Sequence, residues 1–79
     1  MLERIYHSLQ DSDYKLTVYE DEIHLINYKK LLVLEEEKIV VSTSKSIITI
    51  TGENLLLKKL LQNEMLLSGV VQKIEVKYV

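Results

Sequence analysis

The chain has 79 residues, which is room for one domain. A chain of this size buries only about 60% of the surface that its unfolded form exposes, so its core is marginal. It contains no cysteine, which excludes a disulfide framework and a thiolate metal site. We therefore expect self-association to supply the stability that the small core lacks. Neither sign of charge dominates at a net charge of -2, so the composition indicates no polyanionic or polycationic partner.

The first ten residues predict a short amphipathic helix. Their apolar side chains recur at the spacing of one helix face, at Leu2, Ile5, Tyr6 and Leu9. Glu3 and Arg4 interrupt this segment, so it lacks the apolar run of a secretory signal, and no other segment is apolar enough to span a bilayer as a helix. We therefore expect a cytoplasmic protein without direct membrane insertion.

Short apolar runs follow the first segment, separated by polar breaks at a spacing of about eight residues, which is typical of antiparallel strands. Five runs share this pattern: residues 15–20, 23–26, 31–34, 38–43 and 47–51. The last two are so rich in β-branched residues that a helix is disfavoured in either. The sequence therefore predicts a meander of short strands.

The segment from Gly52 to Met65 is ambiguous. Its Leu, Lys, Gln and Glu residues are strong helix formers and Asn54 could cap a first turn, so residue preferences slightly favour a helix. Read with a period of two, it is instead a strand that is apolar on both sides, with Leu55 and Leu57 on one side and Leu56 and Leu60 on the other. From the residues alone both interpretations stay open.

The end of the chain predicts one more strand, and two glycines predict irregular positions. Residues 73–78 alternate between charged and apolar side chains, as a half-buried strand does. Gly52 and Gly69 each separate two β runs, so we expect them to be turn or bulge residues with positive φ. No linker or repeat interrupts the chain, so residues 1–79 form a single small β domain.

No residue pattern predicts catalysis, a metal site or a cofactor. Cysteine is absent, and His7 and His24 are isolated, without a nucleophile motif or a second histidine beside them. His24 lies on the polar phase of its run, which predicts an exposed imidazole. Gly52 and Gly69 stand alone, so no phosphate-binding loop is present. We therefore expect a non-enzymatic protein without cofactor or metal.

A small β-barrel that binds nucleic acid or a small ligand is the alternative. Its stacking surface would consist of Tyr14, Tyr19 and Tyr28, beside the basic residues Lys29 and Lys30. The chain has neither Phe nor Trp, and acidic residues outnumber basic ones, so nucleic acid is the less favoured partner.

Two stretches carry a family resemblance: LTVYEDEIHLINYKKLLVLEEEKIVVST and IITITGENLLLKKLLQNEMLLSGVVQKIEVKY. They resemble the YabP/YqfC family of sporulation proteins of endospore-forming Firmicutes, over residues 16–79. One signature is an Ile-x-Gly-x-Asn-Leu segment, matched by Gly52, Asn54 and Leu55. The other is a Glu-led apolar run followed by a Gly-x-Ile/Val-x-x-Ile strand, matched by Glu64, Gly69, Val71 and Ile74.

The resemblance implies a strand over residues 54–61 and a non-enzymatic function in the sporulation programme. It places that function in the mother cell, near the developing spore envelope. It also implies partners among other sporulation or coat-assembly proteins, including a membrane protein encoded beside this one. The shared residues are structural, so the resemblance implies no catalytic residue.

We therefore expect an all-β domain of about seven or eight short antiparallel strands, in a curved sheet or small sandwich, with a short N-terminal helix. A sheet this small cannot bury both of its apolar faces. We expect it to pack the surplus face, or to pair an edge strand, with a second copy or another protein. The candidate contact residues are apolar and on the outward phase: Ile47, Leu56, Leu66 and Val79.

Overall fold

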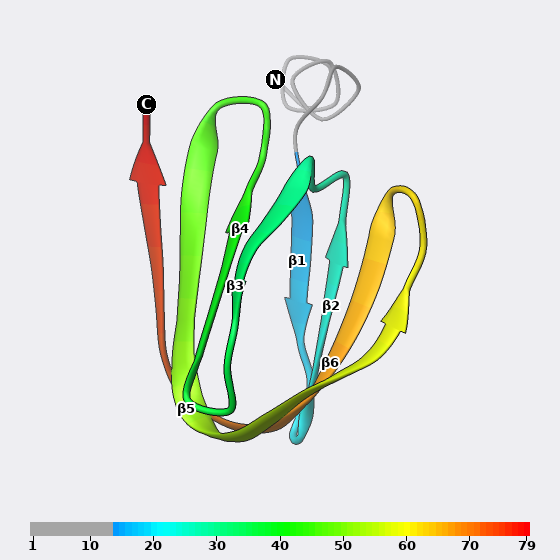
Figure 1. Ribbon diagram of the computed structural model, residues 1–79, viewed down its shortest axis with the longest axis vertical. Coiled ribbons are helices and arrows are strands. Elements are labelled where there is room, and N and C mark those ends of the chain that lie inside the picture. The colour runs from blue at the N-terminus through cyan, green and yellow to red at the C-terminus, as the bar shows by residue number, and fades with distance from the viewer. Residues whose placement is uncertain (1–13) are drawn as a thin grey trace, which may run out of the picture.

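The computed structural model describes residues 14–79, which form one six-stranded antiparallel sheet with the strand order β1-β2-β6-β5-β4-β3 (Figure 1). The strands are β1 (Lys15–Val18), β2 (Glu22–Ile26), β3 (Lys30–Leu34), β4 (Lys38–Ser42), β5 (Ser46–Leu60) and β6 (Glu64–Tyr78). The all-β class predicted from the sequence is confirmed. The helix predicted over residues 1–10 lies outside the described residues.

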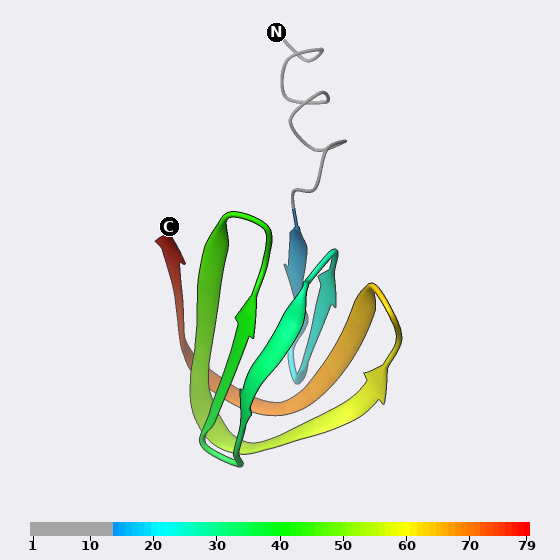
Figure 2. The same ribbon diagram turned by 45° about the horizontal axis from the view of Figure 1, so that its top comes forward.

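Two long, bent strands give the sheet its shape. β4 pairs with the first half of β5, whereas β2 pairs with the first half of β6. Both long strands bend near their middle, so the sheet folds over on itself into a small sandwich (Figures 1 and 2). One layer contains β3, β4 and the adjoining halves of β5 and β6, and the other contains β1, β2 and the remaining halves.

The sequence-based strand count is too high because separate apolar runs belong to one continuous strand. The runs at 47–51 and 54–61 both belong to β5, and the run at 73–78 is the second half of β6, which begins at Glu64. The chain bends between these runs without leaving the sheet, at two irregularities of the β5–β6 register near Gly52. A bulge turns a strand while its pairing continues, which a sequence pattern does not distinguish from a short loop.

The two glycines serve the bend in different ways, and the expectation of positive φ holds only for Gly69. Its φ is 125°, whereas Gly52 has no positive φ. Gly52 instead lies against the backbone of β6, where an added Cβ would overlap the carbonyl oxygen of Val70. Asn54 is the third unusual residue of the bend, with a φ of 55°.

The helix that residue preferences favour after Gly52 is also wrong, because β5 continues to Leu60 as the resemblance implies. Leu55 is buried in the core, and burial of this kind overrides intrinsic preference. A register irregularity between Leu57 and Lys59 shifts the alternation. Leu60 therefore pairs with Met65 and lies on the side opposite to Leu56, and not on the same side as expected, although at the end of β5 it is still 49% exposed.

The core lies between the two layers and consists of alternate residues from the paired strands. Its members are less than a tenth exposed: Ile23, Leu25, Tyr28, Ile39, Val41, Ile48, Ile50, Leu55, Met65 and Leu67. All of them belong to β2, β4, β5 and β6 except Tyr28, which lies between β2 and β3. Leu16 of β1 and Leu31 of β3 are partly buried and pack against this core.

Candidate functional site

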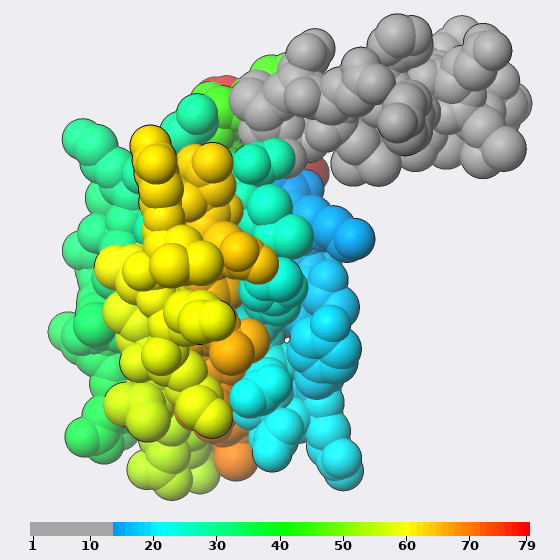
Figure 3. Space-filling model, turned by 90° about the vertical axis from the view of Figure 1, so that its right-hand side faces the viewer, coloured from blue at the N-terminus to red at the C-terminus, as the bar shows by residue number. Residues whose placement is uncertain are grey.

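A shallow hollow lies on the outward face of the layer that contains β1 and β2. Figure 3 shows this face, with β5 in yellow, β6 in orange, β2 in cyan and β1 in blue. The register places His24, Leu66 and Lys59 in one row across β2, β6 and β5. The hollow is lined by Tyr19, Glu22, His24, Lys59, Glu64, Met65 and Leu66.

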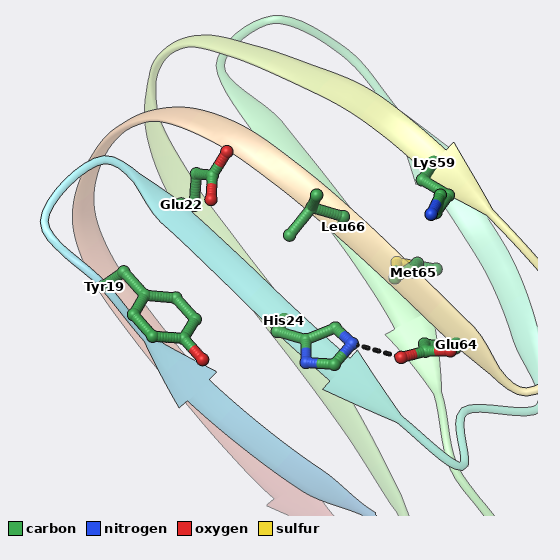
Figure 4. Close-up of a pocket in the computed structure, with 7 residues that line it drawn as sticks. All are labelled: Tyr19, Glu22, His24, Lys59, Glu64, Met65 and Leu66. Carbon is green, nitrogen blue, oxygen red and sulfur yellow. Dashed lines mark hydrogen bonds and ion pairs between the residues drawn. The ribbon is translucent and has the colours of Figure 1, made fainter.

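A histidine–carboxylate pair lies at one end of this hollow. His24 Nε2 is 2.5 Å from Glu64 Oε2, and the two side chains are 28% and 40% exposed (Figure 4). Both point outward from neighbouring strands, because Glu64 pairs with Ile26 and His24 pairs with Leu66. Glu22 begins β2, and its Oε2 lies 3.7 Å from the Nζ of Lys58.

The hollow offers few chemical groups. Its lining has a histidine, two carboxylates, a lysine and a phenol, but no serine, threonine or cysteine to serve as a nucleophile. Among residues 14–79, no three His, Cys, Asp or Glu side chains are grouped to hold a metal ion. Both side chains of the His24–Glu64 pair are partly in water, and pairs that water reaches contribute little to stability.

Sequence reasoning predicted an exposed His24, but its side chain is outward and only 28% exposed, and its partner was missed. The two residues lie 40 positions apart and meet only through the β2–β6 register. The sequence contains no signal for this register, because the bend decides which half of β6 lies beside β2. The two side chains therefore come together only when β2 and β6 pair in the folded chain.

The four predicted contact residues lie in two places. Leu56 is 60% exposed, and Leu66 is half-buried in the hollow, so both belong to the outward face of the β1–β2 layer. Ile47 is half-buried and pairs with Lys77 on the outward face of the other layer. Val79 follows β6 there and is 84% exposed. The fold therefore brings no more than two of them together.

The sandwich leaves much apolar surface uncovered. Ten large hydrophobic side chains among residues 14–79 are roughly half exposed or more: Val18, Tyr19, Leu32, Leu34, Leu56, Leu60, Leu61, Val70, Tyr78 and Val79. A second hollow lies beside the β3–β4 turn and is lined by Leu34, Glu35, Glu36, Leu55, Leu56 and Leu57. Of the exposed residues, Leu34 and Leu56 lie together in this second hollow, and apolar surface that gathers in one place is typical of interaction sites.

The three tyrosines of the alternative hypothesis are distributed over the fold. Tyr28 is buried, and its hydroxyl donates a hydrogen bond to the carbonyl oxygen of Leu61 at 2.6 Å. Tyr14 packs against the core, and Tyr19 is 55% exposed in the hollow at the other end of β1. These positions provide no common stacking surface.

Comparison with known proteins gives no match: no family model, curated protein or solved structure is significantly similar to the chain. The described residues contain no helix that is long and apolar enough to cross a membrane.

Proposed function

We propose that this chain is a non-enzymatic interaction and assembly module of the sporulation programme. It acts in the mother cell, on the cytoplasmic side of the developing spore envelope. Its partners are a second copy of itself and other sporulation or coat-assembly proteins, among them a membrane protein encoded beside it. The resemblance of residues 16–79 to the YabP/YqfC family supports the biological setting.

One observation supports the interaction role above the others. Large apolar side chains such as Leu56, Tyr78 and Val79 are more than half exposed on a chain whose core is small. Exposed apolar area costs free energy of about 25 cal/mol per Å², and covering it with a partner removes that cost. A small domain gains more from such association than a large one, because its own core contributes less.

The biological part of this proposal is tested in the source organism. A fluorescent fusion of the chain should gather around the forespore on the mother-cell side, and deletion of the gene should lower the yield of heat-resistant spores. A fusion that remains diffuse, together with unchanged spore yield, would contradict the proposal. Complementation by the wild-type gene is the control for effects on neighbouring genes.

The contact surface is tested by the same complementation. L56S and L66S change outward side chains, so they should leave the fold intact while they weaken partner contacts. We expect the doubly substituted chain to accumulate normally and to complement less well than the wild type. Full complementation would remove these two residues from the interface.

A further inference from the structure

Four strand edges have no partner strand among residues 14–79: β1, β3, the second half of β5 and the second half of β6. β1 is only four residues long, and β3 has an irregularity between Leu31 and Val33. The second half of β5 has an irregularity between Leu57 and Lys59. Short edges and bulges are common obstacles to strand addition, so these three edges are protected.

The remaining edge is regular. Residues 73–78 of β6, called the β6 edge below, pair with residues 46–51 of β5 without interruption. In Figures 1 and 2 this part of β6, drawn in red, lies at the side of the sheet with no strand beyond it. The chain has no proline, so every residue of the β6 edge has an N–H group for pairing.

Two backbone hydrogen bonds show which groups point away from β5. Val79 N–H donates to the Lys45 carbonyl at 2.9 Å. Because backbone groups alternate in direction along a strand, the N–H and C=O groups of Lys73, Glu75 and Lys77 also point to β5. Thr43 N–H donates to the Ser46 carbonyl at 2.8 Å, which gives the same alternation from the β4 side. The N–H and C=O groups that point to the free side therefore belong to Ile74, Val76 and Tyr78.

The side chains of the β6 edge are complementary to a second copy of themselves. Lys73, Glu75 and Lys77 are exposed on the outward face, in the order positive, negative, positive. Consider two antiparallel copies related by a twofold axis at Val76. Glu75 then lies opposite Lys77 of the second copy, twice, and Ile74 lies opposite Tyr78.

Neighbouring registers are less favourable. An axis at Glu75 places Glu75 opposite Glu75 and Lys73 opposite Lys77, and like charges directly opposite destabilise a strand pair. An axis at Ile74 needs residues 70–72, where the pairing of β6 with β5 is irregular. Charge and regularity thus favour the axis at Val76.

We propose that the chain forms a homodimer in which the β6 edges of two copies pair antiparallel about Val76. This inference rests on the proposed function, because it specifies the surface and the partner of its self-association. The pairing joins two layers into one sheet, from β3 of one copy to β3 of the other. It also brings the apolar side chains of Ile74, Val76 and Tyr78 against those of the second copy.

The test exchanges charges at two exposed positions. E75K and K77E each place like charges opposite one another in both symmetric contacts. Sedimentation velocity at low salt and micromolar concentration should give each variant a dimer dissociation constant at least about tenfold higher than that of the wild type. An equimolar mixture of the two variants restores both opposite-charge contacts and should dimerise again. The double variant E75K/K77E should dimerise alone.

Each other outcome overturns the pairing. A dimer that E75K weakens and K77E leaves unchanged has a different register. A dimer whose dissociation constant changes with neither substitution uses another surface. A wild-type chain that stays monomeric at micromolar concentration has no such dimer. In every case the spore and localisation experiments still decide the proposed function, because they also detect binding to other proteins.

Discussion

Asn54 of β5 and Gly69 of β6 lie against each other with positive φ angles of 55° and 125°. A Cβ on Gly69 would lie 2.6 Å from the Asn54 carbonyl oxygen, closer than real Cβ contacts. This contact occurs where both long strands bend and the sheet folds over its core. The bend therefore depends on two residue types that tolerate positive φ, together with close approach of the two backbones.

Gly69→Ala should destabilise the domain by about 1–3 kcal/mol or more, because it adds both backbone strain and a clash with backbone atoms. Urea unfolding at a fixed protein concentration measures the change. Asn54→Gly is the matched control and should change the free energy of unfolding by less than about 1 kcal/mol, because glycine adopts the same φ freely. Equal stability of Gly69→Ala and the wild type would show that the bend tolerates ordinary residues.

Gly52→Ala should be comparably destabilising for a different reason. Its φ is ordinary, so the cost of about 1–3 kcal/mol comes from the added methyl group pressing on the Val70 carbonyl. The same unfolding experiment tests it. If Gly52→Ala were neutral, the two backbones could not lie as close together as this structure has them.

Tyr28→Phe should cost about 1 kcal/mol, because it removes the hydroxyl that donates to the Leu61 carbonyl while keeping the buried ring. Tyr19→Phe is the control, since that ring is 55% exposed, and should be close to neutral. Thermal unfolding of the two variants compares them directly. A larger effect at Tyr19 than at Tyr28 would contradict the burial described above.

The His24–Glu64 pair should contribute little to stability despite its short distance. A double-mutant cycle of His24→Gln and Glu64→Gln should give a coupling free energy of about 0.2–1 kcal/mol, because both side chains are partly in water. The coupling should shrink with added salt. Coupling several times this size would indicate a buried, functionally constrained pair and would favour a chemical role for the hollow.

The alternation of apolar and polar residues predicted most of the sheet. Residues 38–43 and 47–51 became strands because β-branched side chains favour a pleated, half-buried surface. Residues 54–61 could not be assigned from their preferences alone, since leucine and lysine favour a helix in isolation. Burial of Leu55 decided the outcome, which the period-two reading left open and the family resemblance implied.

The sequence did not predict which segments far apart in the chain lie side by side in the fold. The glycines marked the bends, yet Gly52 and Gly69 could not show that β5 and β6 continue through them. Tyr28 stands in a polar break of the sequence, and nothing there indicates that its ring enters the core. The β6 edge was visible only as a clean alternation at 73–78, and its freedom from a partner follows from the strand order.

Amide hydrogen exchange, measured at two protein concentrations, tests the proposed self-association most directly. The β6 pairing predicts that the amides of Ile74, Val76 and Tyr78 are protected at high concentration and exchange faster on dilution. The amides of Lys73, Glu75 and Lys77, which bond to β5, should remain protected at both concentrations. Exchange at Ile74, Val76 and Tyr78 that is rapid and independent of concentration would contradict the pairing of two copies through β6.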